Sequence, residues 1–385
     1  MKNLGFAKYV LSMVICFSVL SVHARAEQSN TETPRDGELG QSLAEQLKVE
    51  KTGSEIDWLA DVASRIQLHG YAQGWYYAQH AGGKNTNTFL CKRTLFWANA
   101  KITDRWSFLF MHDFNSVVQE YYTDLRLTKN NLLTVRFGQF KNALSYENPL
   151  SPTAMETIDV YSEGVTYLTG CGSDPLNGVQ YGRDQGISFF GETDNKKLRY
   201  ELQVMNGSGI NVKDKNNQKD VIARLEVRPT AGLNLCVTGQ LGKGNALVDS
   251  PVFNPELKLG EDYKRDRWTV GFDYKSPLFN MHGEYLAGKD GKVTSNGAYL
   301  TGSNRLASLS NGCAVDFVWS YDYFNFNKDL EKDMHKVVAG FQYWFFKKCR
   351  FQAQYVYKNA NTDYRSFFEH GANHQFICQM QVRFN

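Results

Sequence analysis

The chain has no long apolar runs beyond its start and little excess of either charge. Its 385 residues are 42% hydrophobic and 22% charged, with a mean hydropathy of −0.45. The 43 bases and 40 acids differ because the first 26 residues carry Lys2, Lys8 and Arg25 but no acid. The remainder is therefore neutral, which disfavours a nucleic-acid-binding protein that works through a bulk basic field. The apolar share argues against low-complexity disorder.

Sequence motifs of catalysis and metal binding are also missing. No G-x-S-x-G pattern occurs, and the one close pair of histidines, His370 and His374, has no matching set of acids. The six cysteines beyond residue 26 have no C-x-x-C spacing, which disfavours zinc and a disulfide scaffold and predicts isolated thiols. We expect no enzyme and no cofactor. These cysteines are Cys91, Cys171, Cys236, Cys313, Cys349 and Cys378.

The start of the chain has the pattern of an export signal. Lys2 and Lys8 precede an apolar run at 9–22, and Ala24-Arg25-Ala26 has the small-x-small form that a signal peptidase accepts. The run of about 14 residues is short for a membrane-anchoring helix, which needs roughly 20. We therefore predict a signal peptide over 1–26, with cleavage before Glu27.

Residues 27–64 are polar and contain Leu39, Leu43 and Leu47 at a spacing of four. That spacing is typical of one helix face. A short periplasmic helix or coiled-coil arm and a disordered tail remain as two alternatives for this segment.

From Arg65 to the end, the sequence alternates apolar and polar residues in short segments separated by Gly, Asn, Asp and Lys. This period of two is typical of antiparallel strands with one apolar and one polar face. The last strand is the clearest example. Its apolar face carries Phe376, Cys378, Met380, Val382 and Phe384, and its polar face carries Gln379, Gln381 and Arg383.

Two architectures have such strands: a soluble sandwich, and a membrane barrel whose apolar faces point outward. Strand length separates them, because the apolar faces extend over the roughly 9 to 11 residues that a bilayer requires. Aromatic residues also gather near strand ends, as at a membrane interface. Such clusters occur at 75–77, 121–122, 321–323 and 343–346. The barrel is favoured.

The strand count gives an even number, as a barrel with both termini on one side requires. Tight turns such as Thr103-Asp104 and Lys129-Asn130 alternate with longer connections. The twelfth strand has the weakest pattern. The sixteen predicted strands cover 65–79, 88–102, 105–116, 119–128, 132–140, 183–193, 197–206, 219–228, 232–242, 264–275, 278–288, 295–302, 312–324, 335–346, 349–360 and 373–384.

The connection after the fifth strand is unusually long, with 40 residues from Lys141 to Gln180 and a predicted helical turn at 154–161. A connection of this length in a compact fold is usually functional. A sixteen-stranded lumen is too wide for side chains to fill. We therefore expect this third external loop to fold inward and narrow the lumen.

Four motifs in and beside this connection resemble the phosphate-selective porin O and P family, in its anaerobe-type branch. They are Val135-Arg136-Phe137-Gly138-Gln139-Phe140-Lys141, Tyr146-Glu147-Asn148-Pro149-Leu150-Ser151-Pro152, Glu156-Thr157-Ile158-Asp159 and Tyr181-Gly182-Arg183-Asp184-Gln185-Gly186. The resemblance implies a sixteen-stranded outer-membrane barrel, usually a homotrimer, that passes small hydrophilic solutes. Some members of the family prefer anions.

The charges of the connection and of the barrel wall predict opposite selectivities. The connection offers one base against five acids, which should repel phosphate, whereas the wall is rich in arginine. The arginines either set up a transverse field across the lumen or form ordinary cross-strand ion pairs. The candidate constriction residues are Lys141, Glu147, Glu156, Asp159 and Glu163, with Asp174 as the fifth acid. The candidate pore-lining bases are Arg126, Arg136, Arg199, Arg224, Arg228 and Arg383.

The sequence as a whole predicts a signal peptide (1–26), a periplasmic segment (27–64) and an all-β, sixteen-stranded antiparallel barrel (65–385) in the outer membrane. The predicted function is passive diffusion of small hydrophilic solutes or ions, with phosphate and other anions among the candidates. Expected partners are outer-membrane lipid and further copies of the chain. A plugged or non-conducting receptor or structural barrel is the alternative.

Overall fold

The computed structural model describes residues 61, 63–174, 178–247, 249, 257–330, 332–346, 348–361 and 371–384. The predicted signal peptide and nearly all of the segment 27–64 lie outside these residues. Residues Arg65–Asn385 form one compact unit. No helix within the described part of the chain is both long and apolar enough to cross a membrane.

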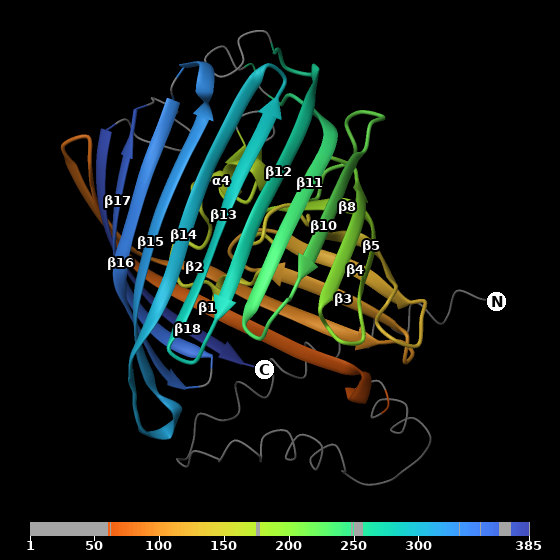
Figure 1. Ribbon diagram of the computed structural model, residues 1–385, viewed down its shortest axis with the longest axis horizontal. Coiled ribbons are helices and arrows are strands. Elements are labelled where there is room, and N and C mark those ends of the chain that lie inside the picture. The colour runs from red at the N-terminus through yellow and green to blue at the C-terminus, as the bar shows by residue number, and fades with distance from the viewer. Residues whose placement is uncertain are drawn as a thin grey trace. The chain divides into compact units, whose positions relative to one another are not determined.

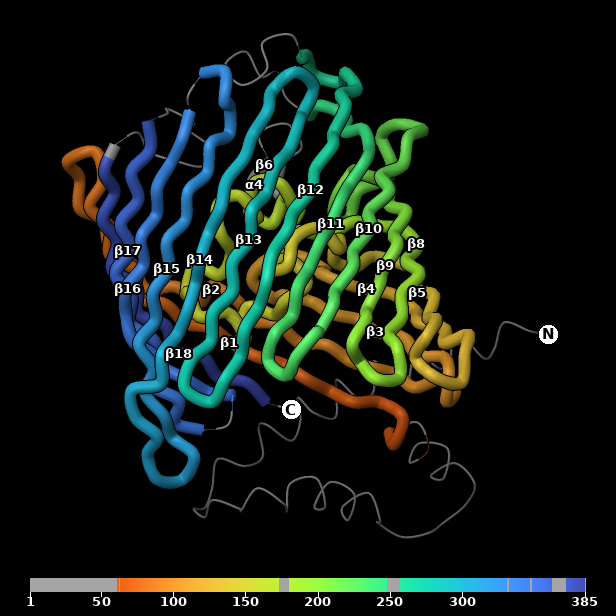
Figure 2. The backbone as a smooth tube through the Cα atoms, viewed as in Figure 1, coloured from red at the N-terminus to blue at the C-terminus, as the bar shows by residue number. Residues whose placement is uncertain are grey.

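Sixteen antiparallel strands close into one barrel (Figures 1 and 2), which confirms the predicted number and arrangement. Neighbours in sequence pair throughout, β5 pairs with β8, and β18 closes the barrel on β1. The strands are β1 (Ile66–Ala81), β2 (Lys84–Lys101), β3 (Trp106–Asp113), β4 (Val118–Arg126), β5 (Thr134–Lys141), β8 (Arg183–Glu192), β9 (Leu198–Met205), β10 (Asp220–Val227), β11 (Leu233–Asn245), β12 (Asp262–Lys275), β13 (Phe279–Asp290), β14 (Val293–Ser308), β15 (Ala314–Asn327), β16 (Lys332–Phe346), β17 (Cys349–Ala360) and β18 (Gly371–Phe384).

The two ends of the barrel differ. We call the end that carries the connection between β5 and β8 the loop side, and the opposite end, where β2 joins β3 and β4 joins β5, the turn side. The connection contains the 3-10 turn η1 (Pro152–Ala154), the helix α4 (Glu163–Thr169) and a small hairpin of β6 (Ser173–Asp174) with β7 (Gly178–Val179). Two more 3-10 turns, η2 (Ser310–Gly312) and η3 (Lys328–Leu330), join β14 to β15 and β15 to β16.

The prediction and the structure differ in two details. The weakly predicted strand at 295–302 is confirmed, but it is the middle of β14, a strand of 16 residues. The helical turn expected at 154–161 is displaced to α4, because the Ser162 side chain accepts the backbone N–H of Val165 and so caps a helix that begins at Glu163. Gly170 ends α4 in the left-handed conformation, with φ of 67°.

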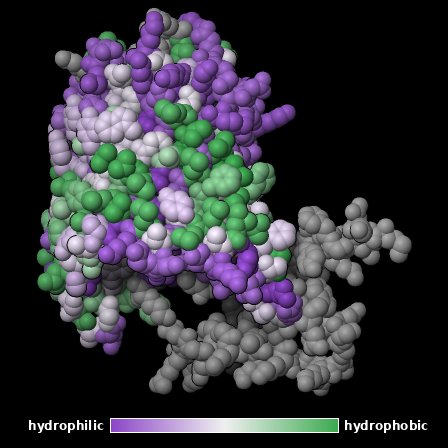
Figure 3. Space-filling view, turned by 45° about the vertical axis from the view of Figure 1, so that its right-hand side comes forward, coloured by the Kyte–Doolittle hydropathy of each residue, from purple (hydrophilic) through white to green (hydrophobic). Residues whose placement is uncertain are grey.

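The outer surface of the barrel is apolar and the inner surface is polar. In β18, Phe376, Met380 and Val382 are 45%, 47% and 50% exposed, whereas Gln379 and Gln381 on the opposite face are fully buried. Hydrophobic side chains gather in a band across the molecule, with hydrophilic ones above and below it (Figure 3). This arrangement fits a lipid-facing barrel.

The apolar core lies between the β5–β8 connection and the inner wall. Leu144, Val165 and Leu168 of the connection pack in one buried cluster with Leu286 and Phe324 of the wall. The connection thus contributes to the core of the barrel. The six cysteines from Cys91 to Cys378 are free thiols.

Candidate functional site

The connection between β5 and β8 is the candidate site, and side chains of the polar wall bind its backbone at the start. The Ser145 N–H donates to Thr238 Oγ1 of β11 (3.0 Å), and its hydroxyl donates to Glu284 of β13 (2.7 Å). The Tyr146 N–H donates to the second Glu284 oxygen (2.8 Å). Arg224 of β10 donates to the Ser145 carbonyl (2.5 Å). These bonds hold Ser145 at a φ of 71°, a conformation that side chains rarely adopt.

The middle of the connection is bound by β17 and β18. Arg350 donates to the Met155 carbonyl (2.7 Å), and Arg383 donates to Thr153 Oγ1 (2.6 Å). Gln354 donates to the Glu156 carbonyl (2.8 Å), and its side-chain oxygen accepts the Ile158 N–H (2.8 Å). Arg350 and Gln354 are buried and bonded to backbone, and Arg383 is half-buried, so these wall groups position the connection.

A charged cluster holds the N-terminus of α4. Glu163 accepts from Lys336 of β16 (2.8 Å) and from Lys358 of β17 (2.9 Å), and its N–H donates to Asp322 of β15 (2.7 Å). Lys358 also donates to Asp159 (3.0 Å). Burial alone would raise the pKa of Asp159, but the ammonium groups of Lys358 and Lys336 outweigh it and lower that pKa to about 2. The pKa of Glu163 is lowered for the same reason, against the effect of burial.

The imidazole of His282, on β13, lies between two carboxylates of the connection. Its Nε2 is 3.1 Å from Glu147, and its Nδ1 is 3.7 Å from Glu156. Glu147 also accepts the N–H of Ser162 (2.8 Å), the residue that caps α4. His282 thus links two parts of the connection that are nine residues apart.

The five predicted constriction residues therefore all lie where the connection contacts the wall, but most of their charged groups are already bonded to other protein groups. Lys141 donates to the Asn148 and Leu150 carbonyls (2.8 and 2.6 Å) and to the Tyr161 hydroxyl (3.0 Å), so it stabilises the connection from within. Burial raises the pKa of that hydroxyl well above its usual value. The acids Glu147, Glu156, Asp159 and Glu163 each lie beside a basic side chain of the wall. A charge count along the connection alone thus overstates the acidity of the site.

The six predicted wall arginines fall into three groups. Arg224 and Arg383 bind the connection. Arg136 forms a two-pronged ion pair with its cross-strand partner Asp124 (2.7 and 2.8 Å), the arrangement expected of an ordinary ladder pair. The remaining three, together with Arg224, line cavities on the turn side; they are Arg126, Arg199 and Arg228.

The larger of two turn-side cavities has a volume of about 820 Å³ and is strongly basic. Tyr146, Pro149 and Leu150 of the connection line one part of it. Two acids, Glu226 and Asp273, also line it. Its six bases are Lys196, Lys197, Arg199, Arg224, Arg228 and Lys275. Four of these bases are in ion pairs: Arg199 with Glu201, Arg224 and Arg228 with Glu226, and Lys275 with Asp273. The excess positive charge that an anion would meet in this cavity is therefore that of Lys196 and Lys197.

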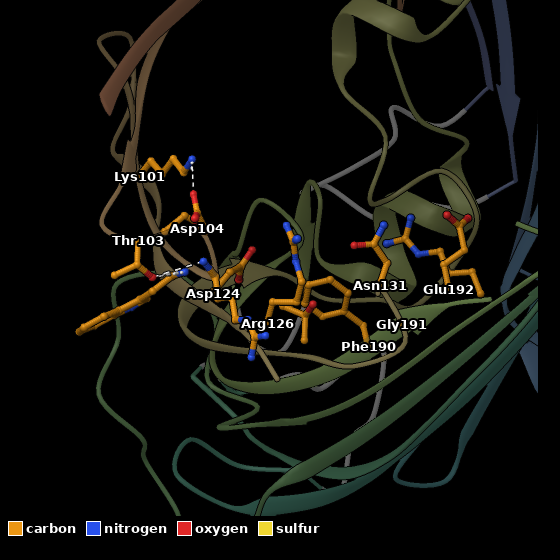
Figure 4. Close-up of a pocket in the computed structure, with 14 residues that line it drawn as sticks. Lys101, Thr103, Asp104, Asp124, Arg126, Asn131, Phe190, Gly191 and Glu192 are labelled. Carbon is orange, nitrogen blue, oxygen red and sulfur yellow. Dashed lines mark hydrogen bonds and ion pairs between the residues drawn. The ribbon is translucent and has the colours of Figure 1, made fainter. Parts of the chain in front are cut away.

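The second cavity, of about 480 Å³, shares Arg199 with the first and is also lined by Arg105. Figure 4 shows Arg126, Asp124 and Glu192 in its lining, together with the ion pair of Lys101 with Asp104 (2.7 Å). Its bases and acids nearly balance. The larger cavity is therefore the more anion-attracting of the two.

Sequence reasoning missed the wall residues that bind the connection, above all Lys336, Lys358, Arg350 and His282. Each lies on the polar face of a strand that was predicted within a few residues of its observed bounds. The alternation could have placed these side chains inside the barrel. Across the described residues, no group of three or more His, Cys, Asp or Glu side chains could hold a metal ion.

Solved structures with the same architecture include an anion-selective porin and other outer-membrane proteins. OprB of Pseudomonas putida shares 9% identity over 85% of this chain and 97% of its own, with a TM-score of 0.63. The anion-selective porin of Comamonas acidovorans shares 12% over 83% and 99%, with a TM-score of 0.59. The trimer form of OmpT of Vibrio cholerae shares 14% over 83% and 99%, with a TM-score of 0.56.

The chain has the porin fold. In sequence it matches none of the family models and none of the curated proteins with which it was compared. At these identities the likeness extends to the fold alone.

Proposed function

We propose that the protein is an outer-membrane porin through which small hydrophilic solutes diffuse passively, with a preference for anions. The observation that carries the proposal is a closed barrel with an apolar outer face, a polar inner face and a basic cavity on the turn side. The N-terminal pattern of a signal peptide agrees with export to the outer membrane. Diffusion needs no catalytic group.

The β5–β8 connection is proposed to be the constriction. It is bonded to the polar face of the wall from β10 to β18, and it shares a buried core with that wall. A segment held in this way narrows a lumen that side chains alone cannot fill. Because its acids lie beside wall bases, the constriction does not act as an acidic ring.

The preference for anions follows from the lining of the larger cavity. Lys196 and Lys197 carry the excess positive charge there, because the other four bases pair with acids, and charge at close quarters acts on a passing ion with little screening. The resemblance of residues 135–141, 146–152, 156–159 and 181–186 to phosphate-selective porins makes phosphate the first anion to test. A trimer is proposed on the same resemblance and on the trimer form of OmpT, the Vibrio cholerae outer-membrane protein of similar fold.

The test is single-channel recording of the purified protein in a planar bilayer, with reversal potentials measured in a potassium chloride gradient. The wild type should open in steps and favour chloride. A variant with Lys196→Gln, Lys197→Gln and Arg199→Gln should lose most of that preference, whereas a control with three exposed lysines outside the cavity changed, Lys84→Gln, Lys129→Gln and Lys328→Gln, should keep it. Added phosphate should reduce the chloride current.

Absence of any steps would overturn the porin proposal in favour of a non-conducting barrel. Steps with equal cation and anion permeability would overturn the anion preference and leave a general porin. Steps that favour chloride without block by phosphate would separate this protein from the phosphate-selective members of the family that it resembles.

A further inference from the structure

Three lysines face outward on adjacent strands at the loop side of the barrel. Lys243 on β11 lies two residues beyond Leu241, which is 66% exposed on the outer face. Lys264 on β12 lies four residues from Trp268, and Lys289 on β13 lies four residues from Tyr285, both also exposed. All three therefore share the outer face, just past its apolar part. We call Lys243, Lys264 and Lys289 the lysine patch.

The patch places like charges opposite each other. Lys243 and Lys264 are cross-strand partners in the β11–β12 ladder, and such a pair destabilises a sheet. Two acids of β12 share this face: Asp266, at 2.5 Å from the Lys264 ammonium group and opposite Lys289 in the β12–β13 ladder, and Asp262, two residues from Lys264. Within the described residues, the ammonium groups of Lys243 and Lys289 have no hydrogen-bond or ion-pair partner. An anion at the patch would offset this repulsion.

The neighbours of the patch indicate the depth at which it lies in a membrane. The rings of Trp268 and Tyr285 are 5.5 Å apart at the loop-side edge of the apolar face. Indole and phenol side chains prefer the boundary between lipid headgroups and acyl chains. Lysines two to four residues further along these strands toward the loop side lie at the headgroups, since their long side chains extend toward water. The lysine patch thus faces headgroups, while Trp268 lies at the boundary with the acyl chains.

We propose that the lysine patch binds the phosphate-bearing headgroup of an anionic lipid in the leaflet on the loop side. This inference rests on the proposed membrane location of the barrel but not on conduction. The occupant is a lipid because the patch is an open outer surface that borders the apolar face, so that a headgroup on the ammonium groups leaves its acyl chains against exposed apolar side chains such as Val237 and Val270. A free phosphate ion would contact the ammonium groups but not the apolar face.

The test is native mass spectrometry of the delipidated protein in neutral detergent, titrated with phosphatidylglycerol or with phosphatidylcholine of the same acyl chains. Each lysine at a membrane surface contributes about 1 kcal/mol, which is roughly fivefold in affinity. The wild type should therefore bind phosphatidylglycerol at least about tenfold more tightly than phosphatidylcholine. The variant Lys243→Gln, Lys264→Gln, Lys289→Gln should lose this difference, and the control Lys84→Gln, Lys129→Gln, Lys328→Gln should keep it.

Equal preference for phosphatidylglycerol in the patch variant and the wild type would overturn the proposal, as would equal binding of the two lipids by the wild type. Displacement of phosphatidylglycerol by millimolar inorganic phosphate would replace the lipid with a free anion as the occupant. Both variants should conduct as the wild type does. A wild type that binds the lipid selectively but does not conduct would refute the porin proposal and support this one.

Discussion

Replacing Lys336 with methionine should release the N-terminal end of α4 from the barrel wall. The Lys336 ammonium group lies 2.8 Å from Glu163, 3.5 Å from Asp322 and 3.2 Å from the Tyr161 carbonyl. The side chains of Lys336, Glu163 and Asp322 are 4%, 7% and 1% exposed, so water cannot replace the lost contacts. Methionine has similar length and no charge, and it therefore removes the ion pairs with little change in packing.

The expected loss of unfolding free energy in Lys336→Met follows from the burial of the cluster. Loss of one partner from a buried ion pair costs about 3–5 kcal/mol, because the remaining charge stays buried without compensation. Lys358 still contacts Glu163 at 2.9 Å, so we expect the lower end, about 3 kcal/mol of unfolding free energy. Adding Glu163→Gln removes the uncompensated charge, so the double variant should recover about 2 kcal/mol of this loss.

The assay is equilibrium unfolding in urea from lipid vesicles for the wild type, both single variants and the double variant. Lys328→Met, at an exposed lysine, serves as the control and should change the unfolding free energy by less than about 0.5 kcal/mol. A loss below about 1 kcal/mol in the Lys336 variant would contradict the cluster as the anchor of α4. Additive effects in the double variant would refute direct coupling between the two residues.

Three further outcomes are expected. Arg199→Gln should weaken the chloride preference in reversal potentials with little change in unfolding free energy, because the side chain is 41% exposed; unchanged selectivity would remove it from the anion path. Lys358 and Lys336 lower the pKa of Asp159 to about 2, whereas its pKa in the unfolded chain is about 4. Asp159 therefore stabilises the fold above about pH 4, and this contribution is lost as the pH falls from about 4 to about 2. An acid titration should therefore show the wild type approaching the stability of Asp159→Asn over that window, and a constant gap would contradict the pairing. Gly138→Ala should reduce the folded fraction on heat-shift electrophoresis, because φ is 140° and a Cβ would lie 2.3 Å from a carbonyl oxygen of β4; normal yield would show that β5 can move away.

The strands were predictable because alternation is local information. In β18 the exposed Phe376 and Met380 and the buried Gln379 and Gln381 repeat the sequence pattern residue by residue. The strands of the turn-side hairpins were located within a few residues for the same reason. α4 was misplaced because its start depends on the cap at Ser162, a single hydrogen bond to Val165 that leaves no periodic signal.

The candidate site was predictable in part. Position in sequence placed Glu163 and Asp159 on the connection and Arg224 on the polar face of a strand. Their partners were not predictable, because the bond between Lys336 and Glu163 joins residues 173 positions apart, and that between Arg350 and the Met155 carbonyl spans 195. Which wall residue meets which part of the connection depends on ladder register and on the path of the connection across the barrel.

The sequence by itself determined the class of fold: strand number, the outward apolar face, the inward polar face and a long connection after the fifth strand. Each of these follows from the two-residue repeat within a strand or from the number of residues in a connection. Both can be taken from consecutive positions in the sequence. Tertiary structure decided the charge of the site. It brought Lys336 and Lys358 to the acids of the connection and gathered Lys196, Arg199 and Lys275 around one cavity. Electrostatic interaction depends on distance in space, and barrel closure brings together strands that are distant in the chain.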